Sequence, residues 1–180
     1  MKSINIYTDG GCSNNQSSEN HGGWGAILEY NGHKKELYGS KKNTTNNQME
    51  IQAVIEALKS LKRHDIHINI FSDSGYVIDC FNKKWYLNWE KNGWKTSSKK
   101  PVENRGLWEE LIALVRKLES VNFYRMKGHL NVGKQAEINT WYEKFKKWNG
   151  DHFTMEDFLY VVDMNNRADE LANVGISEIK

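Results

Sequence analysis

Cysteine, proline and long apolar segments are all scarce in this chain of 180 residues. Its two cysteines, Cys12 and Cys80, provide no disulfide framework, and so low a number is typical of a protein from a reducing cytoplasm. The single proline argues against long disordered linkers. No segment approaches the roughly 18 apolar residues of a membrane span, and the opening MKSINIYTDGG is strand-like, with no apolar signal core. We therefore expect a cytoplasmic protein that does not associate with membranes.

Positive charge is unevenly distributed, although the net charge of the chain is only +2. Residues 81–105 carry seven lysines and arginines against two glutamates, a local balance of +5, so the rest of the chain sums to −3. A polyanionic partner and a merely solvated lysine-rich helix explain this charge equally well.

The spacing of apolar residues predicts a mixed sheet covered by helices. Strands are expected at 4–9, 23–30, 35–39, 67–73 and 121–129, and helices at 46–62, from residue 74 onward and at 107–120. Asn31-Gly32 predicts a tight hairpin between the second and third strands. This order indicates an α/β layer structure with an antiparallel edge and parallel strands joined by helices. The length suits one domain, which we expect to span residues 1–180.

Acidic residues occupy positions where they could converge. Asp9 and Asp73 each follow an apolar strand, and ligands gather at the carboxyl ends of strands in open α/β sheets. Glu50 and Asp169 add carboxylates from the first and last helices. Each has an ordinary alternative, because Asp often forms turns, Glu50 could pair with Asn47 as a helix cap, and Asp169 could lie on a solvated face. Converging carboxylates would require cations, and hard oxygen ligands suit Mg²⁺ or Mn²⁺.

Six segments, in order, resemble type 1 ribonuclease H: YTDGGC, TTNNQMEIQAVIEAL, FSDSGYV, the basic run NKKWYLNWEKNGWKTSSKKPVENRGLW, YRMKGH and NNRADELAN. Each alone is a weak signal, but six in sequence are highly specific. The resemblance implies a ribonuclease H-like three-layer fold, with a five-stranded mixed sheet flanked by helices. It also implies an endoribonuclease that hydrolyses the RNA strand of RNA–DNA hybrids with two Mg²⁺ ions, for which Mn²⁺ can substitute, and leaves 5′-phosphate and 3′-hydroxyl ends.

The same resemblance implies roles for individual residues. Asp9 would bridge both metals, Glu50 and Asp73 would complete one metal site, and Asp169 would hold the other. His129, in the KGH motif, would sit on a mobile loop and assist proton transfer or product release. Without the resemblance, His129 reads as a structural surface histidine.

Substrate contacts are also implied by the resemblance. The RNA strand, which its 2′-hydroxyl distinguishes from DNA, would be lined by Gly10, Cys12, Asn15, Asn46, Gln48 and Glu50. The DNA strand would meet a phosphate pocket and an aromatic groove formed by Thr45, Asn88 and Trp85. Residues 81–105 correspond to the basic protrusion of the family, with Lys91 and Asn104 among the expected contacts. Trp89 and Trp94 are expected to pack within this protrusion.

One segment, at about 131–163, falls outside the resemblance. His129 and Asp169 are forty positions apart, where the family usually has about ten. A first helix is predicted by residues spaced along one helical face, namely Ile138, Trp141, Tyr142, Phe145 and Trp148. Gly150 breaks the pattern, and Thr154 with Asp157 forms the capping pair of a second helix that runs toward Asp169. The sequence therefore predicts an inserted helical hairpin.

Three roles remain open for this segment. Its aromatic face could simply pack on the second helix and the body of the protein. Lys144, Lys146 and Lys147 could instead grip the hybrid beside the active site, or the segment could dock a protein partner.

Two other functions are compatible with the fold. One is a non-catalytic hybrid-binding module, against which all four acidic positions argue, because unpaired acids are costly near phosphate. The other is a transposase- or resolvase-like relative that acts on DNA and would not need the TTNNQME element. We expect a monomeric enzyme whose partner is an RNA–DNA hybrid.

Overall fold

The computed structural model describes residues 2–13 and 19–179, so Asn15, one of the expected RNA contacts, lies outside the described residues. The elements follow in the order β1 (Ser3–Ser13), β2 (His21–Tyr30), β3 (His33–Lys42), α1 (Asn46–Lys59), β4 (His67–Ser72), α2 (Gly75–Asn82), α3 (Trp85–Asn92), α4 (Arg105–Arg116), β5 (Ser120–Arg125), α5 (Gln135–Asn149) and α6 (Met155–Glu178). Within the described ranges, no helix is both long enough and apolar enough to cross a bilayer.

The strands form one mixed sheet in the order β3-β2-β1-β4-β5. β1, β2 and β3 pair antiparallel, whereas β4 is parallel to both β1 and β5. The predicted hairpin joins β2 to β3, and Asn31 and Gly32 have φ angles of 50° and 78°, as a two-residue turn of type I′ requires. The five-stranded mixed sheet expected from the sequence is confirmed.

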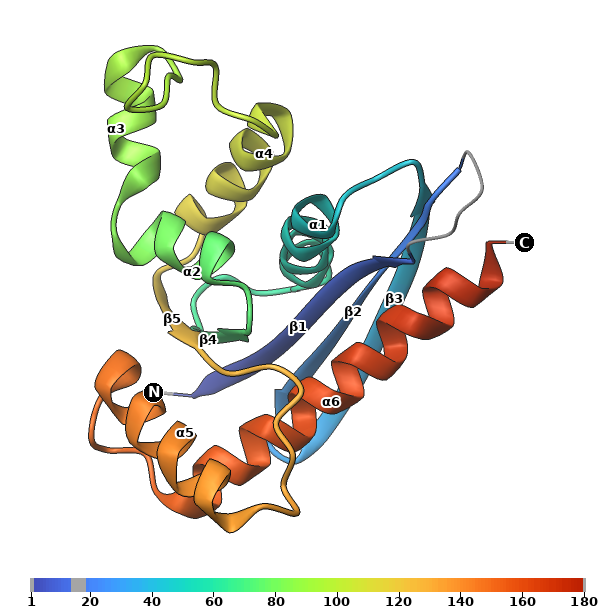
Figure 1. Ribbon diagram of the computed structural model, residues 1–180. Coiled ribbons are helices and arrows are strands. Elements are labelled where there is room, and N and C mark those ends of the chain that lie inside the picture. The colour runs from blue at the N-terminus through green and yellow to red at the C-terminus, as the bar shows by residue number, and fades with distance from the viewer. Residues whose placement is uncertain (1, 14–18, 180) are drawn as a thin grey trace.

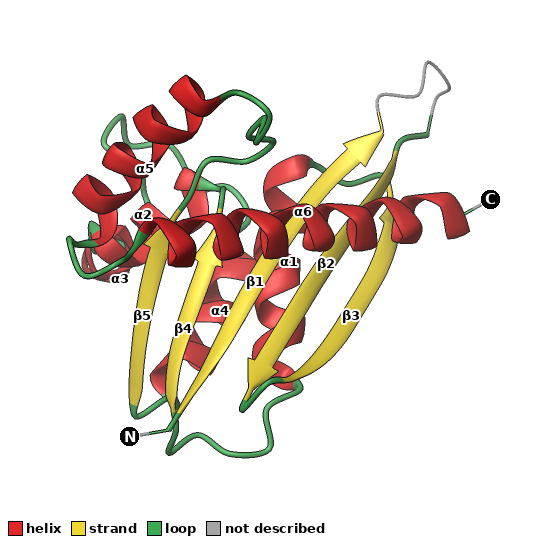
Figure 2. Cartoon of the chain, turned by 90° about the horizontal axis from the view of Figure 1, so that it is seen from below, coloured by secondary structure: helices red, strands yellow, loops and turns green. Residues whose placement is uncertain are grey.

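Helices cover both faces of this sheet, which confirms the three-layer arrangement. Figure 2 shows α6 crossing one face, with α1 and α4 behind the other. Successive residues of a strand point to opposite faces, so Ile6 belongs to the core under α1 and α4, and Tyr7 to the core under α5 and α6. Both side chains are almost fully buried.

Helix α6 packs very closely on β2, and Gly25 permits this. A Cβ atom added to Gly25 would overlap the carbonyl oxygen of Ala168. The absence of a side chain at residue 25 therefore sets the distance between the sheet and the helical turn that carries Asp169.

The segment between β5 and Asp169 contains the two helices that the sequence predicts. α5 ends before Gly150, and α6 begins with a capping box in which the backbone N–H of Asp157 donates to Thr154 Oγ1 (3.0 Å) and the backbone N–H of Thr154 donates to Asp157 Oδ2 (2.9 Å). Phe145 of α5 and Phe158 of α6 are fully buried, with ring centroids 5.3 Å apart. The aromatic face of α5 thus packs, at least in part, on the second helix.

Several predicted boundaries are wrong: the helix expected to reach residue 62 ends at Lys59, and the strands expected at 4–9 and 35–39 are longer. The last strand ends at Arg125 rather than at residue 129, because a loop carrying the KGH motif leaves the sheet there. The helix expected at 107–120 is α4, which begins at Arg105 and ends at Arg116. A further short helix, α3, lies within the basic protrusion and projects away from the sheet (Figure 1).

Candidate active site

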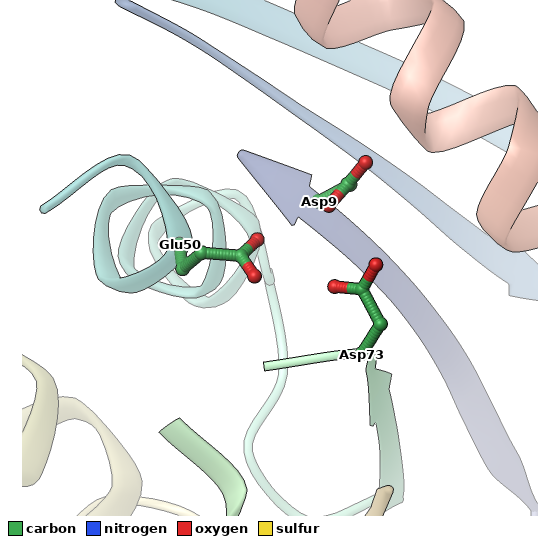
Figure 3. A group of neighbouring side chains, drawn as sticks. All are labelled: Asp9, Glu50 and Asp73. Atoms are coloured by element: carbon green, nitrogen blue, oxygen red, sulfur yellow. The ribbon is translucent and has the colours of Figure 1, made fainter. Parts of the chain in front are cut away.

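Asp9 and Asp73 meet at one edge of the sheet because β1 and β4 are parallel neighbours. Thr8 pairs in register with Ser72, so the next residue of each strand lies at the same level. Asp9 continues β1, whereas Asp73 follows the last residue of β4. The sequence prediction that these two carboxylates lie side by side is confirmed (Figure 3).

Glu50 reaches the same place from the first turns of α1 (Figure 3). The helix begins two residues earlier than a cap at Asn47 would allow, because Thr45 is the N-cap and its Oγ1 accepts the backbone N–H of Gln48 (3.1 Å). The predicted capping pair of Asn47 and Glu50 is therefore wrong. The close approach of α1 depends on Gly10, where a Cβ atom would overlap the backbone of Met49. The Glu50 carboxylate is thus available to the site.

The three carboxylates form a compact group. One oxygen from each of Asp9, Glu50 and Asp73 lies within 4.8 Å of the other two. Asp9 and Glu50 are buried, and Glu50 Oε1 has no hydrogen-bond partner among the described residues. A buried carboxylate oxygen without a donor is costly, so Glu50 Oε1 favours a cation at this position.

Asp169, on α6, lines the same cleft and contributes to its charge. Burial and, after it, the charges of Asp73 and Asp169 together raise the pKa of Asp9 to about 9. The pKa of Glu50 is also raised well above its usual range, first by burial and then by Asp73 and Asp9. Like charges this close do not all ionise unless a cation compensates them.

The donor set suits a divalent cation. Carboxylate oxygens are hard ligands of the kind that Mg²⁺, Ca²⁺ and Mn²⁺ prefer. The unpartnered Glu50 Oε1 and the raised pKa of Asp9 are both relieved when a cation enters the group. The residues present therefore fit a divalent metal site.

The cleft around these carboxylates has a volume of about 550 Å³ and includes several of the expected substrate contacts. They are Gly10, Cys12 and Asn46, together with His129. Asn46 Oδ1 accepts the backbone N–H of Cys12 (2.7 Å), which ties the start of α1 to the end of β1. His129 is exposed at the cleft, in the loop between β5 and α5.

A second set of expected contacts lies on the basic protrusion. Trp85, Asn88 and Lys91 line a groove of about 580 Å³ on α3. Thr45 was expected to share a phosphate pocket with Asn88, but its hydroxyl caps α1 and it is absent from the described lining of this groove. The predicted contacts therefore fall into two clusters.

Other residues connect and support the protrusion. Gln48 Nε2 donates to Asn104 Oδ1 (3.1 Å) and so links α1 to the start of α4. The rings of Trp89 and Trp94 lie 5.6 Å apart, and Trp89 lies at the same distance from Trp108. The expectation that Trp89 and Trp94 pack within the protrusion is confirmed.

Sequence reasoning missed a group of residues beside Asp73. Arg125 and Lys127, at and just after the end of β5, line a cavity with Asp73 and with Trp141 and Trp148 of α5. The helical spacing of the tryptophans was a usable signal, but nothing local marks Arg125, which lies 24 positions from the α5 residue that fixes it.

Comparisons with known proteins agree with this geometry. The sequence model of the RNase H family matches residues 1–177. A ribonuclease H from Thermoanaerobacter sp. (strain X514) is 51% identical over 126 residues, which cover 70% of this chain and 78% of that protein. One from Chlorobaculum parvum is 41% identical over 177 residues, covering 98% of this chain and 97% of the relative.

Solved structures share the fold of this chain. LC9-RNase H1, described as a type 1 RNase H with the type 2 active-site motif, superposes with a TM-score of 0.71 at 25% identity and covers 99% of this chain and 74% of its own. LC11-RNase H1, solved in complex with an RNA/DNA hybrid, shares the fold with a TM-score of 0.60 at 20% identity, over 97% of each chain.

Proposed function

Since the chain belongs to the ribonuclease H family, we propose that it is a divalent-metal-dependent endoribonuclease. It hydrolyses the RNA strand of RNA–DNA hybrids and leaves 5′-phosphate and 3′-hydroxyl ends. The observation that carries this proposal is the convergence of Asp9, Glu50 and Asp73 at the carboxyl edge of the sheet, within a family match that spans residues 1–177. One catalytic domain over residues 1–180 is consistent with two cores that share a single sheet.

The carboxylates hold the metal ions in this proposal. Asp9, Glu50, Asp73 and Asp169 would hold two Mg²⁺ ions, Asp9 contributing to both, Glu50 and Asp73 to one and Asp169 to the other, and Mn²⁺ could substitute. When bound, such ions activate water and neutralise charge that develops on the phosphate. The buried position of Asp9 and Glu50 orients their oxygens before substrate arrives. His129, exposed at the cleft, exchanges a proton with the departing product or assists its release.

Substrate contacts follow the two clusters of residues. Backbone groups of Gly10 and Cys12, with the side chains of Asn46 and Gln48, meet the RNA strand next to the carboxylates, where Asn15 would join them. The DNA strand meets Trp85, Asn88 and Lys91 on α3. It also meets Thr45 and Asn104, the residues that directly precede α1 and α4. Backbone phosphates dominate the affinity, so binding weakens with salt.

The alternatives receive less support. A non-catalytic hybrid-binding module gains nothing from a buried, unpartnered carboxylate oxygen at Glu50, which costs stability. A DNA-acting relative has no need for the polar first turn of α1 that lies against the cleft. We further propose a monomer in the cytoplasm, in keeping with the free thiols of Cys12 and Cys80.

Cleavage of matched substrates tests the proposed function. End-labelled RNA–DNA hybrid, double-stranded RNA and double-stranded DNA of one sequence are incubated with Mg²⁺, with Mn²⁺ or with EDTA. We expect cleavage of the hybrid alone, only in its RNA strand, and a complete loss of activity in EDTA that added metal restores. Faster cleavage of double-stranded DNA, or activity that survives EDTA, would contradict the proposal.

A further inference from the structure

A second cavity, of about 430 Å³, shares Asp73 and His129 with the active-site cleft. Its other walls come from the end of β5, from the loop that follows, and from α5, which lies beside the end of β5 (Figure 2). Most of its larger side chains are cations or tryptophans, and we call them the cation–tryptophan cluster: Arg125, Lys127, Trp141, Lys144 and Trp148.

The cluster is fixed in place by the fold. Asn149, at the end of α5, bonds both backbone polar groups of Arg125: its Oδ1 accepts the Arg125 N–H (3.0 Å) and its Nδ2 donates to the Arg125 carbonyl (2.7 Å). Phe145, one turn earlier, is fully buried against α6. Helix α5 is therefore anchored both to the end of β5 and to the core, beside Asp73.

The cations of the cluster lie over the tryptophan rings. The Arg125 guanidinium carbon is 4.6 Å from the ring centroid of Trp148, and the Nζ atoms of Lys127 and Lys144 are 5.2 Å and 4.5 Å from that of Trp141. Cation–π contacts orient a charged side chain without consuming its N–H donors. The donors of all three cations remain available to an anion.

Among the described residues, these cations have no carboxylate partner within ion-pair distance. In the part of the chain that the structure describes, no ion pair within 4 Å reaches Arg125, Lys127 or Lys144, whereas Lys146 on the same helix pairs with Glu143 (3.1 Å). The acidic residue in the described lining is Asp73, which the proposed function assigns to metal. Three cations therefore face a cavity that opens beside the reacting phosphate.

We propose that the cation–tryptophan cluster binds backbone phosphates of the RNA strand next to the scissile phosphate, an inference that rests on the proposed function. In the proposed function, the RNA strand runs past the carboxylates to be cleaved. The second cavity lies next to them, because Asp73 lines both it and the active-site cleft. Each tryptophan ring already contacts at least one cation, which leaves less of the ring for base stacking and favours contact with phosphate. Arg125 presents a planar fork that suits a phosphate group. This grip is independent of base sequence.

The structure distinguishes the three lysines for which contact with the hybrid was one of three open roles. Lys144 lines the cavity. Lys146 follows two positions later, about 200° around the helix, and contacts Tyr142 and Glu143 instead. Lys147 is exposed but is not among the described lining residues. Lys146 therefore provides a matched control on the same helix.

Variants of the cluster test the proposal in two assays. Arg125→Gln, Lys144→Gln, the double variant and the control Lys146→Gln are compared in hybrid cleavage and, on an Asp9→Asn background, in binding of labelled hybrid by fluorescence anisotropy. Loss of one phosphate contact at a partly exposed site should weaken affinity about 3- to 10-fold. We expect a raised KM, a kcat within about 2-fold of the parent, and a salt dependence less steep by about one power of salt for each cation removed.

Further measurements separate a phosphate contact from a structural role and from a different partner. Lys144→Arg should retain affinity, Lys146→Gln should change nothing, and melting temperatures should remain those of the parent. Neutral methylphosphonate groups in the RNA strand beside the cut should remove the difference between the parent and the double variant. Parental affinity and salt dependence in the double variant, or the same effect from neutral groups in the DNA strand instead, would overturn the proposal. If the wild type cuts no hybrid, the proposed function fails, and the anisotropy assay still decides on the cluster.

Discussion

Replacement of Asp9 by Asn should lower kcat for hybrid cleavage by roughly 10³- to 10⁴-fold, because metal-ion catalysis is worth several kcal/mol of barrier. The two side chains are nearly equal in size, but Asn carries no charge and offers one oxygen fewer. The charges of Asp73 and Asp169 both raise the pKa of Asp9, so its carboxylate interacts with both of them. Loss of the Asp9 carboxylate should therefore disrupt the whole metal site rather than only remove one of its ligands.

The loss of kcat in Asp9→Asn should not result from unfolding of the protein. Burial and the neighbouring carboxylates raise the pKa of Asp9 from its ordinary 3.8 to about 9, so ionisation of Asp9 destabilises the folded protein, and this cost grows as pH rises from about 4 to 9. In metal-free protein at neutral pH, Asp9→Asn should melt at the same temperature as the wild type or higher. Single-turnover cleavage and a melting curve on the same preparation measure both effects.

A matched control is available on α6. Asp163 is exposed and lies on the same helix as Asp169 but outside the described lining of the cleft. Asp163→Asn should cleave hybrid at the wild-type rate. An equal loss of kcat in Asp9→Asn and Asp163→Asn, or an active Asp9→Asn enzyme, would contradict the assignment.

Substitution of Gly25 by Ala should damage both stability and activity, although residue 25 touches no substrate. The added methyl group would overlap the carbonyl oxygen of Ala168, next to Asp169. Overpacking of this kind costs about 1–3 kcal/mol, which corresponds to a fall in melting temperature of about 3–10 °C for a chain of this size. Because relief of the overlap displaces α6, kcat well below the melting temperature should also fall, by about tenfold or more.

Gly106→Ala is the control for this substitution. Gly106 lies in the first turn of α4, and an added Cβ atom meets nothing within 4 Å. Alanine is the better helix former, so this variant should melt at the wild-type temperature or slightly above it. Differential scanning calorimetry, with hybrid cleavage at 25 °C, compares the two variants. A Gly25→Ala protein as stable and active as Gly106→Ala would show that the contact between α6 and β2 does not set the position of Asp169.

The part of the site built by neighbouring strands could be predicted from the sequence. Asp9 and Asp73 each follow an apolar strand, and parallel pairing of such strands brings their ends together whatever else the chain does. The capping box of Thr154 and Asp157 was predictable for a similar reason, because both partners lie three positions apart on one helix.

Two features could not be predicted from the sequence. One depended on a choice between residues with similar capping propensities, and the other on a contact between residues far apart in the chain. The segment TTNNQ offers several residues that cap helices well, and propensity does not rank Thr45 above Asn47. With the cap at Thr45, Glu50 is not a capping partner, and its carboxylate lies with those of Asp9 and Asp73. Arg125 acquires its setting from Asn149, a contact between residues 24 positions apart that no local pattern indicates.

Binding of Mn²⁺ to the metal-free protein, followed by electron paramagnetic resonance between pH 6 and pH 8, tests the carboxylate site most directly. The metal must displace a proton from Asp9, whose pKa is about 9, so affinity should rise about tenfold for each pH unit in this range. Asp9→Asn should bind Mn²⁺ far more weakly and with a shallower pH dependence, because of the two carboxyls with a raised pKa, Asp9 and Glu50, only Glu50 still has a proton to lose. Equal affinity and equal pH dependence in the two proteins would show that Asp9, Glu50 and Asp73 do not form the metal site.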